Sequence, residues 1–176
     1  MGEQERLDLK SKLRQIKDFP KEGVNFIDIT TVLQDPDAFR NSVDQMAELI
    51  SDLDYDLIIG SESRGFIMGA PLAYATGVGF IPVRKSGKLP YQTVGTNYQL
   101  EYGVDRLEMH TDAIKPGQKV LIVDDLLATG GTAEANCDLV EKLGGEVVGL
   151  LFFIELLDLN GRDKLEGYRI ESVVQF

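Results

Sequence analysis

The segment VLIVDDLLATGGT, residues 120–132, constrains the fold and the chemistry of this chain more than any other stretch. It begins as an apolar run of strand length, continues with two adjacent acids and ends in a turn rich in glycine and threonine. Acids at the end of a buried strand lie at the sheet edge where α/β proteins bind their ligands. Because neighbouring side chains on a strand diverge, Asp124 and Asp125 can reach two different hydroxyls, such as the 2′ and 3′ groups of a ribose.

The turn Ala128–Thr132 supplies what a phosphate monoester needs. Its two glycines let the backbone curl so that successive amides converge, and its two threonines add hydroxyl donors. A helix predicted from Ala133 would present its positive end to the same point. An isolated Gly-Gly-Thr would more often be a plain helix start, but the strand and the acid pair favour a site for a phosphorylated ribose.

The rest of the chain alternates apolar runs with amphipathic stretches. Asp35 and Pro36 predict a helix start, after which apolar residues recur at helical spacing, at Phe39, Val43, Met46 and Ile50. Further helices are predicted over residues 64–76 and 133–143, the second closed by a Gly-Gly pair, and strands over residues 56–60, 80–83, 119–123, 146–155 and 168–175. This order indicates an α/β fold with a mostly parallel sheet flanked by helices.

Residues 84–110 do not fit this alternation. The stretch is long, contains glycine, and shows a strand-like alternation only around residues 98–102. An excursion of this kind is usually a lid or a binding loop, or else disordered.

Composition narrows the class of protein. Eighteen Lys and Arg against 29 Asp and Glu give a formal charge of -11, which would repel a polyanion, so nucleic acid is not an expected partner. No apolar run approaches the roughly 20 residues that a membrane helix requires. The polar N-terminus does not resemble a signal peptide, and the single cysteine cannot form an internal disulfide, so a cytoplasmic location is expected.

The strand, the acid pair and the sequence ATGGT resemble the signature with which type I phosphoribosyltransferases bind phosphoribosyl pyrophosphate (PRPP). Other segments resemble the adenine-specific branch of that family in order and approximate spacing: FPKEGVNFIDIT at 19–30, SRGF at 63–66, VRK at 83–85, GKLP at 87–90 and LEYG at 100–103. The resemblance runs from about Phe19 to at least Lys164, which is nearly the whole chain.

The resemblance implies a single type I phosphoribosyltransferase domain over residues 1–176. Residues 1–33 would contribute to a small base-binding hood, and residues 84–110 would form a flexible lid. The implied reaction belongs to purine salvage: adenine and PRPP give AMP and pyrophosphate, with Mg²⁺ held mainly through PRPP rather than by protein ligands. Family members are homodimers, so a homodimer is expected.

The resemblance also assigns roles to residues. Phe26 would stack on adenine, while the backbone at Asn25 and Ile27 would read the exocyclic amine and a ring nitrogen. The family often has a basic residue at the position of Ile27, so any charged role of that side chain is absent here. The pyrophosphate would be gripped by the loop Ser63, Arg64 and Gly65 and approached by Lys85 and Lys88.

Within the same resemblance, Asp124 and Asp125 would hold the ribose, and the 5′-phosphate would be bound by Ala128, Thr129, Gly130, Gly131 and Thr132. Glu101 is the candidate for acid–base chemistry near N7 of the purine, and Tyr102 would help to close the lid. His110 and Cys137 are interpreted as structural.

Three alternatives stay open. A hypoxanthine or guanine phosphoribosyltransferase would share the PRPP site, although the segment at 19–30 argues against it. A non-catalytic PRPP-sensing regulator is opposed by the acidic charge and by the presence of Glu101. A receiver-type signalling domain could also begin with VLIVDD, but receivers carry that strand at the start of the domain.

Overall fold

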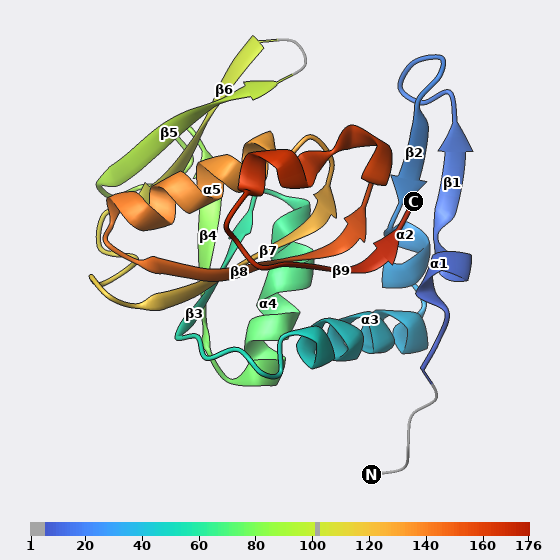
Figure 1. Ribbon diagram of the computed structural model, residues 1–176, viewed down its shortest axis with the longest axis horizontal. Coiled ribbons are helices and arrows are strands. Elements are labelled where there is room, and N and C mark those ends of the chain that lie inside the picture. The colour runs from blue at the N-terminus through green and yellow to red at the C-terminus, as the bar shows by residue number, and fades with distance from the viewer. Residues whose placement is uncertain (1–5, 101–102) are drawn as a thin grey trace.

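A computed structural model describes residues 6–100 and 103–176 and contains one seven-stranded sheet at its centre (Figure 1). The strand order is β5-β6-β4-β3-β7-β8-β9, and β4, β3, β7, β8 and β9 run parallel to one another. The strands are β3 (Leu57–Ser61), β4 (Gly79–Lys85), β5 (Thr93–Leu100), β6 (Gly103–His110), β7 (Lys119–Leu127), β8 (Glu146–Glu155) and β9 (Ile170–Gln175). The mostly parallel α/β fold is confirmed.

Helices cover both faces of the sheet. On one face, α3 (Pro36–Leu49) and α4 (Arg64–Thr76) pack on residues such as Ile58 and Leu121; on the other, α5 (Gly131–Lys142) packs on residues such as Ile59 and Ile122. Neighbouring residues of one strand thus enter opposite halves of the core, as the pleat requires. The remaining helices are short: α1 (Leu9–Lys12), α2 (Thr30–Leu33) and the 3-10 segments η1 (Leu157–Leu159) and η2 (Gly161–Leu165).

A separate two-stranded sheet lies beside the main one. Its strands β1 (Arg14–Lys17) and β2 (Asn25–Asp28) are antiparallel, with Ile16 opposite Phe26. Figure 1 shows this sheet standing next to the end of β9 and the C-terminus, on the opposite side from the β5–β6 hairpin. Within the described residues β2 pairs only with β1, and Figure 1 shows β2 on the side of this sheet nearer the main body.

Several predicted elements agree with the structure. The predicted helix over residues 64–76 coincides with α4, and the predicted strand over residues 146–155 coincides with β8. The helix start at Asp35 is confirmed, since its carboxylate accepts hydrogen bonds from the amides of Asp37 and Ala38.

Two predicted boundaries at the centre of the chain were wrong. The strand predicted to end at Val123 continues to Leu127, because β8 pairs with it along that whole length, as far as Leu127 opposite Glu155. The helix predicted from Ala133 already begins at Gly131. The acid pair therefore lies inside a strand, and the last two residues of the glycine–threonine turn, Ala128–Thr132, belong to the first helical turn.

Residues 84–100 and 103–110 are largely regular. The first two extend β4, and β5 and β6 form an antiparallel hairpin that continues the main sheet at its edge. In the part of the chain that is described, no helix is long and apolar enough to cross a membrane.

Candidate active site

The site forms where β7 extends beyond the end of its neighbour β3. These strands pair only from Leu57 opposite Val120 to Gly60 opposite Val123, after which the chain leaves β3 and enters α4. The space beside Asp124 is filled by the start of α4, so closely that a Cβ on Gly65 would lie 2.9 Å from Oδ1 of Asp124. This close approach explains the glycine in Ser63–Gly65, which we call the serine–arginine loop.

The two acids of β7 are linked to each other and to Arg64. Nε of Arg64 lies 2.8 Å from Oδ2 of Asp125, whose residue is 6% exposed, and the amide of Asp125 donates to Oδ1 of Asp124 at 2.9 Å. Burial raises the pKa of Asp124, and the neighbouring Asp125 raises it further. Burial also raises the pKa of Asp125, although Arg64 opposes this effect. The pair thus needs a partner with hydroxyl donors or positive charge.

The glycine–threonine turn presents unused backbone donors. Gly130 has a φ of +84° and packs against the backbone of Gly161, which leaves no room for a side chain. The first hydrogen bond of α5 runs from the amide of Glu134 to the carbonyl of Gly130 at 2.9 Å. Among residues 6–100 and 103–176, no acceptor is bonded to the amides from Ala128 to Ala133. Such a set of amides at a helix N-terminus is suited to an anion.

Arg64 lies at the junction of three hollows, which together contain most of the predicted site residues. The first is lined by Asp124 and the glycine–threonine turn. The second is lined by Asp125 and Phe26, whose ring centroid is 5.9 Å from Cζ of Arg64. The third is an open cleft lined by Ser63, Lys85 and Lys88. The acid pair therefore lies between two positions suited to anions.

A larger hollow of about 640 Å³ separates the two-stranded sheet from the glycine–threonine turn. Asn25 and Ile27 on β2 line one side of it, and Leu156, Leu159 and the C-terminal Phe176 line another. Phe26 is held by an edge-on contact with Phe19, with ring centroids 5.2 Å apart. An apolar hollow beside an open strand edge can accept a flat ring and offer it backbone hydrogen bonds.

Sequence reasoning missed Glu62, which lines two of these hollows. Its Oε2 accepts the amide of Lys85 at 2.9 Å and lies 3.3 Å from Nε of Arg84, and the amide hydrogen bond is the main reason why its pKa is lowered. Lys85 itself forms a 3.1 Å ion pair with Asp105 on β6. Apart from its place before the serine–arginine loop, nothing in the sequence pattern indicates a role for Glu62.

Tyr98 was also missed, although it falls within the alternation seen around residues 98–102. It lines the hollow that contains Asp124, donates to Asp105 at 3.2 Å, and has its pKa raised to about 12, mainly by burial. Glu101 and Tyr102 lie outside the described residues. Their described neighbour Gln99 brings its carbonyl to 3.2 Å from the position of a Cβ on Gly131, so this end of the hairpin reaches the glycine–threonine turn.

The two residues interpreted as structural lie away from these hollows or behind them. His110 ends β6, and its Nε2 is buried with no hydrogen-bond partner among the described residues. Cys137 is 3% exposed inside the core that α5 forms with the sheet.

Comparison with known proteins agrees with this geometry. The family described as phosphoribosyl transferase domain matches residues 28–172. A protein from Ruminiclostridium cellulolyticum named adenine phosphoribosyltransferase is 67% identical over 171 residues, which cover 97% of this chain and 100% of that protein. The adenine phosphoribosyltransferase of Acetivibrio thermocellus is 63% identical over the same shares of the two chains.

Solved structures give the same result. The crystal structure of adenine phosphoribosyltransferase from Thermoanaerobacter pseudethanolicus superposes with a TM-score of 0.94 at 54% identity and covers 96% of this chain and 98% of its own. The Saccharomyces cerevisiae enzyme, crystallised with an imino-altritol bisphosphate and adenine, superposes with a TM-score of 0.89 at 41% identity, covering 94% and 96%. The chain therefore belongs to the adenine phosphoribosyltransferase family and is a pentosyl-transferring enzyme.

Proposed function

We propose that the chain transfers the 5-phosphoribosyl group of PRPP to adenine, forming AMP and pyrophosphate, and that the hollows around Arg64 are where this happens. The observation that carries the proposal is the acid pair on β7, with the unused amides of the glycine–threonine turn on one side and the cleft of Ser63, Lys85 and Lys88 on the other. PRPP carries its 5′-phosphate and its pyrophosphate on opposite ends of one ribose, which matches this order.

Asp124 and Asp125 are proposed to hold the ribose hydroxyls. Burial raises the pKa of both carboxyl groups, and Asp125 raises the pKa of Asp124 further, so hydroxyl donors that satisfy the carboxylates lower the cost of keeping them ionised. As pyrophosphate departs, positive charge develops on the ribose, and nearby carboxylates stabilise it. The amides from Ala128 to Thr132, with the hydroxyls of Thr129 and Thr132, would meanwhile anchor the 5′-phosphate.

Pyrophosphate is assigned to the serine–arginine loop and to Lys85 and Lys88, whose positive charges suit it. Mg²⁺ is expected to be held mainly by PRPP oxygens, because no group of three His, Cys, Asp or Glu that could hold a metal is present among the described residues. When bound, the cation neutralises charge on the leaving group.

Adenine is assigned to the hollow beside β2. Phe26 would stack on the ring and the backbone at Asn25 and Ile27 would read its polar edge, so residues 1–33 act as a hood over the base. Residues 84–110 are proposed as the lid, with Glu101 as the acid–base group near N7 and Tyr102 closing over the substrate. Replacing Glu101 by Ala should lower kcat far more than PRPP affinity, and unchanged turnover would contradict its role.

A homodimer is proposed as the working form, in the cytoplasm. The exposed face of α4 supports the dimer: Ile67 is 38% and Tyr74 91% exposed, two turns apart on the helix that Arg64 begins. A second copy on this face would lie next to the site. Sedimentation of the wild type and of Tyr74→Glu tests the idea, since only the wild type should then be dimeric.

Product analysis tests the reaction itself. The chain would be incubated with Mg²⁺, PRPP and either adenine, hypoxanthine or guanine, and the products would be separated by chromatography. AMP and pyrophosphate from adenine alone are the expected result. Turnover of hypoxanthine or guanine in preference to adenine would overturn the base assignment, and tight binding of PRPP without any product would favour a regulator.

A further inference from the structure

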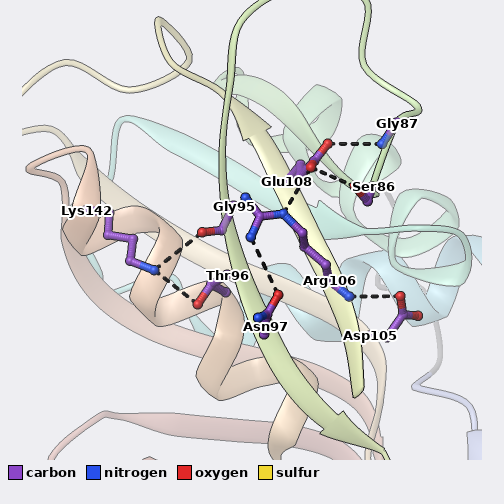
Figure 2. A network of polar contacts seen from close by, with 9 residues as sticks. All are labelled: Ser86, Gly87, Gly95, Thr96, Asn97, Asp105, Arg106, Glu108 and Lys142. Atoms are coloured by element: carbon purple, nitrogen blue, oxygen red, sulfur yellow. Dashed lines mark hydrogen bonds and ion pairs between the residues drawn. The ribbon is translucent and has the colours of Figure 1, made fainter. Parts of the chain in front are cut away.

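The carboxylate of Glu108 is a buried charge with no part in the roles assigned so far. It lies on β6 opposite Arg84 of β4, and its residue is 8% exposed. Three donors surround it: Oγ of Ser86 at 2.8 Å, the amide of Gly87 at 3.1 Å and Nε of Arg106 at 3.1 Å. Figure 2 shows these groups converging on the carboxylate from the turn on one side and from β6 on the other.

Two of these donors belong to the lysine turn, Lys85–Lys88, which begins with the last residue of β4. Gly87 has a φ of +77°, and the turn closes on itself through the amide of Lys88 and the carbonyl of Lys85 at 3.3 Å. The amide of Ser86 donates to the carbonyl of Arg106 at 3.2 Å. Two carboxylates therefore hold the lysine turn. Glu62 accepts a hydrogen bond from the amide of Lys85 at one end, and Glu108 accepts one from the amide of Gly87 near the middle.

The two lysines at the ends of this turn face the cleft of the serine–arginine loop, whereas Glu108 does not line that cleft. Lysine side chains are long and flexible, so the position of each ammonium group depends on how firmly its backbone is held. Ionic hydrogen bonds from a buried carboxylate to an amide and a hydroxyl are among the stronger ones available for this purpose.

We infer that Glu108 is a positioning residue for pyrophosphate: without touching the ligand, it holds the lysine turn so that Lys85 and Lys88 face the leaving group. The inference rests on the proposed function. It separates the two anion positions, because among the described residues no hydrogen bond joins Glu108 to the glycine–threonine turn, which would bind a 5′-phosphate without it.

The hairpin offers a matched control on its other strand. There, Thr96 donates to Asp138 of α5. Figure 2 shows Nζ of Lys142 beside the same strand, 3.1 Å from Oγ1 of Thr96 and 3.4 Å from the carbonyl of Gly95. Asp138 thus anchors β5 to α5 as Glu108 anchors β6 to the lysine turn. Removing either carboxylate should loosen the hairpin, but only Glu108 holds the turn that carries Lys85 and Lys88.

The test is calorimetric titration of the full chain with Mg²⁺ and inorganic pyrophosphate, and separately with AMP. Glu108→Ala should raise the Kd for pyrophosphate about tenfold or more, the size expected for losing ionic hydrogen bonds that hold the turn, and leave the Kd for AMP within about twofold. Glu108→Gln, which keeps one acceptor oxygen, should fall between Glu108→Ala and the wild type. Asp138→Ala should leave the Kd for pyrophosphate unchanged.

Equal losses of AMP and pyrophosphate affinity in Glu108→Ala would show a general structural role and overturn the inference, as would no loss of either. Ser86→Ala removes one of the three donors at the surface of the turn and keeps the test open if the Glu108 variants do not fold; it should raise the Kd for pyrophosphate by about threefold. A wild type that binds neither ligand would overturn the proposed function as well, so the two failures are distinguishable.

Discussion

Replacing Glu155 by Gln should destabilise the protein in a strongly pH-dependent way. Glu155 ends β8 with its side chain 4% exposed, and it accepts hydrogen bonds from Nε and Nη2 of Arg162 at 2.6 and 2.7 Å. Ser172 and Gln175 on β9 also donate to it, at 2.7 and 3.1 Å. Arg162 is the main reason why the pKa of Glu155 falls from 4.5 to about 2. Each unit by which the pKa is lowered corresponds to about 1.4 kcal/mol, so ionised Glu155 adds about 3 kcal/mol at most to the free energy of unfolding.

The sign of the pH dependence follows from the lowered pKa. The contribution is complete above about pH 4.5, where the unfolded chain is ionised as well, and it is lost as the pH falls toward 2. The difference in unfolding free energy between wild type and Glu155→Gln should therefore shrink from about 3 kcal/mol at pH 7 to about 1 kcal/mol at pH 3.

Urea denaturation followed by circular dichroism measures this difference, because the chain has no tryptophan to report by fluorescence. Protein concentration must be held constant, since any association contributes to apparent stability. Glu171→Gln is the matched control: Glu171 also pairs with an arginine, Arg169 at 3.1 Å, but its side chain is 33% exposed, so its loss should cost less than about 1 kcal/mol. A cost for Glu155→Gln that is equal at pH 7 and pH 3 would refute the electrostatic reasoning.

Three other changes test the site. Phe26→Ala should raise KM for adenine about tenfold or more through lost stacking while KM for PRPP stays within about twofold; a parallel rise in both would contradict the base assignment. Gly65→Ala would place a methyl 2.9 Å from Oδ1 of Asp124 and should lower kcat about a hundredfold in steady-state assays, whereas retained activity would show that the close approach is unimportant. Gly130→Ala should weaken AMP binding in titrations, but Gly77→Ala, with a similar φ of +76° and nothing within 4 Å of its Cβ, should not; equal affinities for AMP would argue against the turn as the phosphate site.

Much of the fold was predictable because local signals and burial agree. The carboxylate of Asp35 sets the start of α3, and alternate residues of β3 and β7 enter the two halves of the core. The end of β7 was not predictable from its own residues. Asp124 and Asp125 are poor strand formers, and only pairing with β8, a long-range contact, keeps them in the strand.

The site was predictable where its chemistry resides in one segment and not where it depends on a distant contact. Residues 120–132 contain the acid pair and the turn together, so their proximity needed no fold. Glu62, Tyr98 and Glu108 make their hydrogen bonds to residues of other strands or turns, and a glutamate or tyrosine in isolation gives no sign of such a partner. The β5–β6 hairpin was interpreted as a long excursion because its two strands are held by pairing with each other, and neither strand alone shows that pairing in its sequence.

The separate sheet of β1 and β2 has a consequence for how the specificity of such an enzyme can change over time. Among the described residues, no strand of this sheet pairs with a strand of the seven-stranded one, so replacements of exposed residues within it leave the register of the central strands intact. Selection can therefore remodel the part proposed to face the nucleobase while the residues proposed to bind the sugar and phosphates are inherited unaltered. A lineage could acquire a different base preference by changing exposed residues of this sheet, provided that Leu13 and Ile27, which are buried in the main core, are kept.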